Sequence, residues 1–173
     1  MIISRMTSPI ASEDLRQLTA LMQEAVSLGA SIGYTDATQQ VDAMHHYWQQ
    51  QSHAITEGNV QFFCARVNDQ IVGVIGLERC GKYNGTHRGE IFKLMVSQAW
   101  RRQGIAKKLM QTAIDSAIQL GLKLLVLDTR SEDFTVKLYR SLGWIVVGEI
   151  PHYAQSTSGE YQATTVMFLH LSR

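Results

Sequence analysis

The sequence predicts an α/β (α+β) fold, in which one mixed, mostly antiparallel sheet has a central parallel strand pair and flanking helices. Strand-like runs joined by short turns precede a strand–helix–strand stretch in the middle of the chain, and two more strand-like runs follow it. A long helical crossover makes the strands that it joins parallel, whereas short turns make neighbouring strands antiparallel. The length of 173 residues is typical of one domain, so residues 1–173 are expected to form a single domain.

Composition and charge exclude several classes of partner. The chain is 45% apolar and 18% charged, with a net charge of +1, so nothing attracts it as a whole to nucleic acid or to a membrane surface. The start has no secretory signal pattern, and no apolar stretch is long enough for a membrane span. Cys64 and Cys80 lie in separate predicted strands without a CxxC spacing, and we expect reduced thiols in a cytoplasmic protein.

A short apolar strand and two helices are predicted in the first third of the chain. Ser12 is the expected cap of a helix whose apolar positions recur with the 3.6-residue period. Two glycines within residues 29–34, "GASIGY", interrupt this pattern. Asp36 or Thr38 is expected to begin a second amphipathic helix, which Gly58 ends.

Two antiparallel strands are predicted next, over residues 60–67 and 70–80. Both are rich in β-branched, aromatic and other apolar residues, as strands in a core are. Asn68 and Asp69 separate them, and two such residues between strand-like runs indicate a hairpin.

A third strand and the central helix follow. Asn84 and Gly85 both tolerate a positive φ, so they predict a type I′ turn that leads into a strand over residues 86–96. The helix begins near Gly104, and its apolar positions step by four and three residues along the chain. Gly121 fits the left-handed cap at its end.

The last third is predicted as strand, short helix and two strands. Residues 122–129 form a nearly continuous apolar run, which is typical of a strand covered on both faces. The helix is expected over residues 133–142, and the last strands over 144–150 and 164–171. These two strands are joined by a polar loop that contains Pro151, Gly159 and Tyr161.

Positive charge gathers where the central helix is expected to begin. Between residues 91 and 114 there are five cations and no carboxylate. The amino end of a helix carries a partial positive charge, so cations are unfavourable there unless an anion is present. Either this segment is a solvated basic surface or it binds an anion. Nucleic acid is a poor explanation, because the basic run at residues 101–108 has no interleaved aromatic residues and the chain as a whole is not basic.

The segment "LMVSQAWRRQGIAKKLM" resembles the acyl-CoA-binding motif of the GNAT acetyltransferase superfamily, [Q/R]-x-x-G-x-[G/A], with Arg101, Gly104 and Ala106 at its positions. The order of the predicted elements is also similar to that superfamily. "GASIGY", "LLVLDT" and "LYRSLGW" look like the tabtoxin-resistance branch, whose members acetylate an amino group of a β-lactam dipeptide-like toxin. This resemblance covers most of the chain from Gly29 onward.

The resemblance implies an acetyl-CoA-dependent N-acetyltransferase. The acceptor would be a primary amine of a small molecule, such as an amino-acid-like toxin or antibiotic, which attacks directly in a ternary complex. The chain would then serve toxin resistance. Two alternatives remain: a protein or peptide α-amine acetyltransferase, and a catalytically silent acyl-CoA-binding sensor. We expect acetyl-CoA as co-substrate and no metal, nucleic acid or membrane partner; a homodimer is left open, since dimers are common among GNAT relatives.

The same resemblance implies where acetyl-CoA would bind. Two parallel strands splay apart, the pantetheine arm pairs with the first of them, and backbone N–H groups after it cradle the pyrophosphate. A backbone N–H near Met95 would stabilise the oxyanion. The expected acetyl-CoA-binding residues are Leu94, Met95, Val96, Arg101, Arg102, Gln103, Gly104, Ile105 and Ala106.

Three residues are the expected catalytic groups. By resemblance, Glu90 and Asp128 bind the amine and accept its proton through water, and Tyr139 protonates the leaving thiolate. Each also has a plainer interpretation: an exposed acid, a turn residue and a packing tyrosine. Many GNAT enzymes have Asn and Ala where this chain has Glu132 and Thr135, which puts the usual side-chain contact to the pantetheine arm in doubt.

Overall fold

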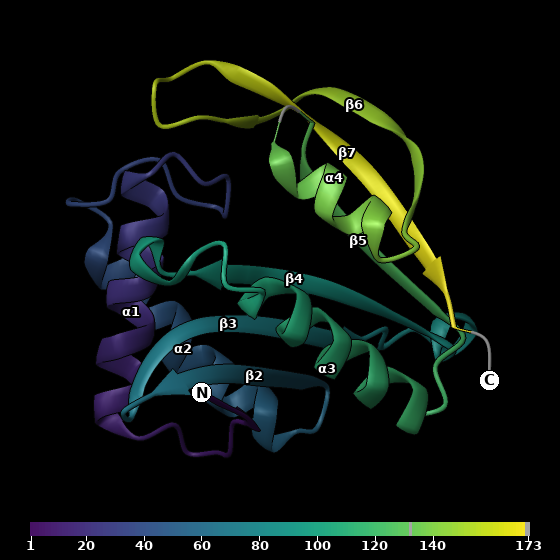
Figure 1. Cartoon of the computed structure of the whole chain (residues 1–173), viewed down its shortest axis with the longest axis horizontal. Helices are drawn as coiled ribbons and strands as arrows, with labels where there is room; N and C mark the ends of the chain where they lie inside the picture. Colours follow the sequence, from purple (N-terminus) through teal and green to yellow (C-terminus); the bar gives the residue numbers. More distant parts are fainter. Residues whose placement is uncertain (132, 172–173) are drawn as a thin grey trace.

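The computed structural model describes residues 1–131 and 133–171 (Figure 1). Within these residues seven strands form a sheet in the order β1-β2-β3-β4-β5-β7-β6. The strands are β1 (Ile2–Arg5), β2 (Val60–Val67), β3 (Gln70–Arg79), β4 (Arg88–Val96), β5 (Leu124–Arg130), β6 (Ile145–Gln155) and β7 (Tyr161–His170). The helices are α1 (Ser12–Ser27), α2 (Val41–Thr56), α3 (Ile105–Gln119) and α4 (Phe134–Ser141).

The predicted mixed sheet with a central parallel pair is confirmed. β4 and β5 are parallel neighbours, and the other strand pairs of the described chain are antiparallel. The parallel register covers three residue pairs and ends at Glu90 and Val126. Beyond that point β4 and β5 diverge toward the side where α1 lies (Figure 1). The sheet therefore opens at its centre, just after the predicted base Glu90.

Helices cover both faces of the sheet. Successive residues of a strand point to opposite faces. Along β2, Phe62 and Cys64 pack with α1 and α2, whereas Phe63 and Ala65 pack with α3. Tyr139 of α4 belongs to the same hydrophobic cluster as α3. Two cores, one on each face, therefore hold β2 to β4 in place.

The predicted starts of the first two helices were wrong by one to a few residues. Ser12 does not cap α1, because it is itself the first helical residue and the residue before it makes no side-chain cap. The second helix begins at Val41 rather than at Asp36 or Thr38. The Asp36 carboxylate instead accepts hydrogen bonds from the N–H and hydroxyl of Thr38, both at 2.8 Å, and this local turn competes with the helix.

One of the two predicted hairpin turns is confirmed. Asn68 and Asp69 have φ of 49° and 62°, as a type I′ turn between β2 and β3 requires. The type I′ turn predicted at Asn84 and Gly85 was wrong, because residues 83–85 form a 3₁₀ turn. Glycine is needed at position 85 for another reason: a Cβ there would lie 2.5 Å from the Cys80 sulfur.

The predicted loop between the last two strands was too long. Pro151 lies within β6 and Tyr161 begins β7, so the connection shrinks to residues 156–160. The β6–β7 register is irregular around Pro151, and His152 there has φ of 54°. Such a bulge on an edge strand tolerates proline, which has no N–H to donate to the ladder.

The expectation that β5 is covered on both faces also needs correction. Leu125 and Leu127 are buried, but Asp128 is exposed and Val126 is only half-buried. One face of β5 thus packs on the core, while the other opens toward the gap between β4 and β5.

Candidate active site

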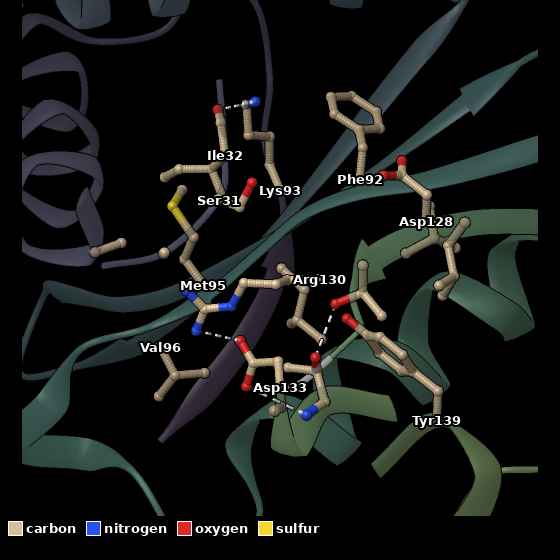
Figure 2. Close-up of a pocket in the computed structure, with 18 of the residues that line it drawn as sticks. Ser31, Ile32, Phe92, Lys93, Met95, Val96, Asp128, Arg130, Asp133 and Tyr139 are labelled. Carbon is tan, nitrogen blue, oxygen red and sulfur yellow. Dashed lines mark hydrogen bonds and ion pairs between the residues drawn. The ribbon is translucent and has the colours of Figure 1, made fainter. Parts of the chain in front are cut away.

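A cleft of about 1250 Å³ lies where β4 and β5 diverge. Its walls come from β4, β5, α4 and residues 30–33 of the α1–α2 connection (Figure 2), and the start of α3 lines it as well. Every residue expected to bind acetyl-CoA lines it except the exposed Gln103. Glu90, Asp128 and Tyr139 line it as well, so one cleft holds both predicted sets.

The start of α3 presents free backbone N–H groups and basic side chains to open space. Gly104 is the N-cap with φ of 76°, and a Cβ there would meet no atom within 4 Å, so this backbone faces open space. The first intrahelical bond runs from the Lys108 N–H to the Gly104 carbonyl, which leaves the N–H groups of the first turn free. Arg101, Arg102 and Lys107 are exposed around them. The arrangement fits a phosphate group.

The edge of β4 is free along the cleft. After Glu90 the described β4 residues have no partner on β5. The pairing with β3 is interrupted between the Phe92–Gly76 and Met95–Val74 pairs, and Lys93 in this bulge has φ of 52°. An extended ligand can pair with such an edge as an added strand would.

Carboxylates meet at the floor of the cleft. Glu90 pairs with Val126, and Asp128 lies two residues further along β5, so both side chains share a face. Glu78 of β3 is the direct partner of Glu90 and was not predicted. Glu90 is exposed to the open cleft, and its partial burial, followed by the charges of Glu78 and Asp128, raises the pKa of Glu90. The Thr164 hydroxyl donates to the Asp128 carboxylate at 2.8 Å.

Tyr139 combines packing with access to the cleft. The residue is 6% exposed, its ring lies 6.2 Å from that of Trp144, and it lines the cleft (Figure 2). Burial, followed by the nearby carboxylates of Asp133 and Asp128, raises the pKa of its hydroxyl well above the usual range. The hydroxyl therefore stays protonated at neutral pH and has a proton to donate.

Two basic side chains of the cleft, Lys93 and Arg130, were not predicted as site residues, although Lys93 was counted among the cations of residues 91–114. The Lys93 ammonium donates to the Ile32 carbonyl at 2.7 Å and lies 5.1 Å from the centre of the Tyr47 ring. Burial lowers the pKa of Lys93, and Asp128 opposes that shift. Arg130 donates to the Gly29 carbonyl of the same α1–α2 connection at 2.8 Å. Neither side chain belongs to a motif, and their partners are far away in the sequence.

Comparison with known proteins identifies the family. The model of the acetyltransferase (GNAT) family matches residues 18–144, which include the open edge of β4, the start of α3 and α4. The chain belongs to the GNAT acetyltransferase family. Its predicted membership, made from "RRQGIA" and the order of elements, is thereby confirmed.

Two curated proteins are related to this GNAT chain. It is 35% identical over 89 residues to "Probable N-acetyltransferase camello" of Xenopus laevis, a match that covers 50% of this chain and 39% of that protein. It is 31% identical over 97 residues to N-acetyltransferase 8 of Homo sapiens, covering 55% of this chain and 43% of that protein. The matched part thus spans about two fifths of each relative.

Solved structures share the GNAT fold along nearly the whole chain. A phosphinothricin acetyltransferase from Sinorhizobium meliloti, in complex with acetyl-CoA, has a TM-score of 0.82 at 17% identity, covering 99% of this chain and 90% of that one. The Salmonella typhimurium protein yncA, solved with its cofactor acetyl-CoA, has a TM-score of 0.79 at 19% identity, covering 100% and 96%. These TM-scores, at such low identities, show a common fold and no more.

Aromatic rings support the floor of the GNAT cleft. Tyr47, Trp48, Phe62 and Phe92 contact one another in sequence, edge to face, with ring centres 5.1 to 5.3 Å apart. Tyr47 and Phe92 line the cleft, whereas Trp48 is fully buried. A Cβ at Gly76, on the neighbouring strand, would lie 2.6 Å from the Phe92 ring. Because glycine has no Cβ, the Phe92 ring can pack against position 76.

Of the two residues that depart from the usual GNAT pattern, Thr135 is described by the structure. Thr135 lines the cleft, and its hydroxyl lies 2.8 Å from that of Thr129. Glu132 lies outside the described residues.

In the described part of the chain, no group of three or more His, Cys, Asp and Glu side chains could hold a metal ion. No described helix combines the length and apolarity that crossing a membrane requires.

Proposed function

We propose that this GNAT chain transfers the acetyl group of acetyl-CoA to a primary amine of a small molecule, by direct attack in a ternary complex. One observation carries the proposal. A single cleft joins an anion-binding helix start and a free strand edge to the carboxylates of Glu90 and Asp128 and to Tyr139. The related folds that were solved with acetyl-CoA support the choice of donor.

The donor end fits acetyl-CoA, which supplies an activated acetyl thioester when bound. The free N–H groups after Gly104 suit the pyrophosphate, and Arg101 and Arg102 screen its charge. The edge formed by Leu94, Met95 and Val96 suits the amide groups of the pantetheine arm. A backbone N–H near Met95 would donate to the oxygen on which charge develops.

Proton transfers to and from side chains of the cleft complete the reaction. The attacking amine must be neutral, so Glu90 takes one proton from it through water, and Asp128 helps to bind its ammonium form. The raised pKa of Glu90 makes it a stronger base than an ordinary carboxylate. As the carbon–nitrogen bond forms and the carbon–sulfur bond breaks, Tyr139 gives one proton to the leaving sulfur. The acetylated nitrogen loses its remaining excess proton through water, which restores the Tyr139 hydroxyl.

A small acceptor agrees better with the cleft than an extended peptide does. Residues 30–33 line the cleft beside Tyr47 and Tyr153, so the acceptor end has walls where a peptide groove would be open. The resemblance of "GASIGY" and "LYRSLGW" to the tabtoxin-resistance branch supports an amino-acid-like toxin or antibiotic as acceptor. Free thiols at Cys64 and Cys80 agree with a reducing compartment such as the cytoplasm.

Mass spectrometry of a metabolite mixture incubated with the protein and acetyl-CoA tests the proposal. We expect at least one small amine to gain the mass of one acetyl group, with release of an equal amount of thiol. Acetylation of peptides but of no small amine would favour the peptide α-amine alternative. Binding of acetyl-CoA without turnover on either panel would favour the sensor, and absence of binding would refute all three.

A further inference from the structure

A short segment links the two arms of the cleft, which are the diverging strands β4 and β5. Residues 29–33, here called the strap, connect α1 toward α2, and all but the first line the cleft. The Gly29 carbonyl accepts a hydrogen bond from the Arg130 guanidinium at 2.8 Å. The Ile32 carbonyl accepts one from the Lys93 ammonium at 2.7 Å. Because Arg130 lies on β5 and Lys93 on β4, the strap is anchored once on each arm.

The ends of the strap have a backbone suited to turning. Gly29 and Gly33 have φ of 81° and 94°, conformations that glycine adopts at little cost. A Cβ at Gly29 would lie 3.9 Å from the Thr157 hydroxyl, so the β6–β7 turn also reaches this end. The N–H groups of Gly29 and Ala30 donate to carbonyls of α1, both at 2.9 Å, and beyond them the strap is held by side chains from elsewhere in the chain.

Arg130 has a second partner, and that partner belongs to α4. Its guanidinium lies 3.4 Å from the Asp133 carboxylate (Figure 2). Asp133 is the N-cap of α4 and accepts from the Thr135 N–H. Tyr139 lies on the same helix, one turn further along. A guanidinium has donors in a rigid fork and can hold two acceptors at once, which an ammonium does less well.

We propose that Arg130 is a positioning residue, which couples the strap at the acceptor end to the helix that carries Tyr139. With both contacts in place, the acceptor is enclosed and the start of α4 is fixed against β5. Without Arg130, the strap loses its anchor on β5 and the α4 cap loses its counter-ion. The kinetic consequence rests on the proposed acetyl transfer, whereas the physical coupling does not.

Steady-state kinetics with both substrates test the consequence. Since a hydrogen bond to a charged group is strong, Arg130→Gln should raise the acceptor KM about tenfold and lower kcat about tenfold. The KM for acetyl-CoA should stay unchanged. Arg130→Lys keeps the charge and should recover part of each loss. Arg140→Gln, which alters an exposed arginine on the same helix, is the control and should change neither parameter. Unchanged kcat in Arg130→Gln would overturn the proposal.

Asp133→Asn separates the two contacts. Asparagine still caps a helix, but it removes the negative partner of Arg130 and leaves the Gly29 contact intact. We expect a lower kcat at an unchanged acceptor KM. An increase in KM alone would contradict the coupling. This variant also serves if Arg130→Gln does not fold.

Hydrogen exchange of the protein without substrates tests the coupling itself. Arg130→Gln should speed amide exchange in the strap and in residues 134–139, whereas Lys93→Gln should speed it in the strap alone. Arg140→Gln should match the wild type. Faster exchange confined to the strap in Arg130→Gln, or no change at either segment, would overturn the coupling. The expected exchange pattern in a protein that acetylates nothing would refute the proposed function and leave the coupling in place.

Discussion

Glu78 and Glu90 are direct partners in the register of β3 and β4. Like charges directly opposite one another on a sheet destabilise it. No described side chain forms an ion pair with either carboxylate. The pKa of Glu90 is raised, mainly because its carboxyl is partly buried and further because of the negative charges of Glu78 and Asp128. The pKa of the proposed base therefore depends on Glu78, a residue that belongs to no recognised motif.

Glu78→Gln should move the acid limb of the pH profile of kcat/KM to lower pH. In the wild type, activity falls as the pH drops through the raised pKa of Glu90, because the base becomes protonated. Removing one neighbouring negative charge lowers that pKa toward its ordinary value. The profile is measured by thiol release, with Asp115→Asn on the exposed side of α3 as control. An acid limb that does not move would exclude Glu90 as the titrating base.

Glu90→Gln should stabilise the protein at neutral pH and leave its stability at low pH almost unchanged. The pKa of Glu90 is raised in the folded chain, so its favourable contribution is present below the unfolded pKa. That contribution is lost as the pH rises through the folded pKa. Urea unfolding at acidic and at neutral pH measures the difference. A variant that is less stable than the wild type at neutral pH would contradict the assignment.

Tyr139→Phe should lower kcat about a hundredfold and leave the KM for acetyl-CoA unchanged, if the hydroxyl is the general acid. Phenylalanine keeps the ring that packs near Trp144, so the thermal midpoint should stay close to that of the wild type. Tyr161→Phe, an exposed tyrosine outside the cleft, is the matched control. An unchanged kcat would leave Tyr139 as a packing residue only.

Gly104→Asp should weaken acetyl-CoA binding about tenfold more than Gly104→Asn does, because only the first adds a negative charge at the helix start. Both variants accept a similar strain at φ of 76°, and neither side chain meets an atom within 4 Å at its Cβ. Gly121→Asp places the same charge at the other end of α3, at φ of 77°, and should bind normally. Calorimetry with acetyl-CoA gives the affinities, and equal values for the two Gly104 variants would refute the phosphate site.

Local patterns predicted the parts of the site that depend on neighbours in the chain. Gly104 between a strand and an apolar-periodic helix located the start of α3 correctly, and together with the GNAT-like motif it predicted an anion site there, which stays a prediction. The crossover rule made β4 and β5 parallel neighbours, and Glu90 and Asp128 met for that reason. Tyr139 was named from the resemblance to GNAT enzymes, and its role as general acid stays a prediction.

The remaining contacts depend on register and on distant segments. Glu78 faces Glu90 only in the register that β3 and β4 adopt, and hydrophobic pattern alone does not specify it. Arg130 and Gly29 are 101 residues apart in the sequence. The prediction of a type I′ turn at Gly85 was wrong, because the sequence does not reveal that the backbone at Gly85 approaches the Cys80 sulfur closely.

Gly76 has a consequence for how relatives of this chain diverge. It does not line the cleft, yet a single methyl group there would displace Phe92, which does. Acceptor range can therefore change through a mutation behind the cleft wall. Two family members with identical wall residues would then admit acceptors of different size, and a comparison restricted to those residues would not detect the difference.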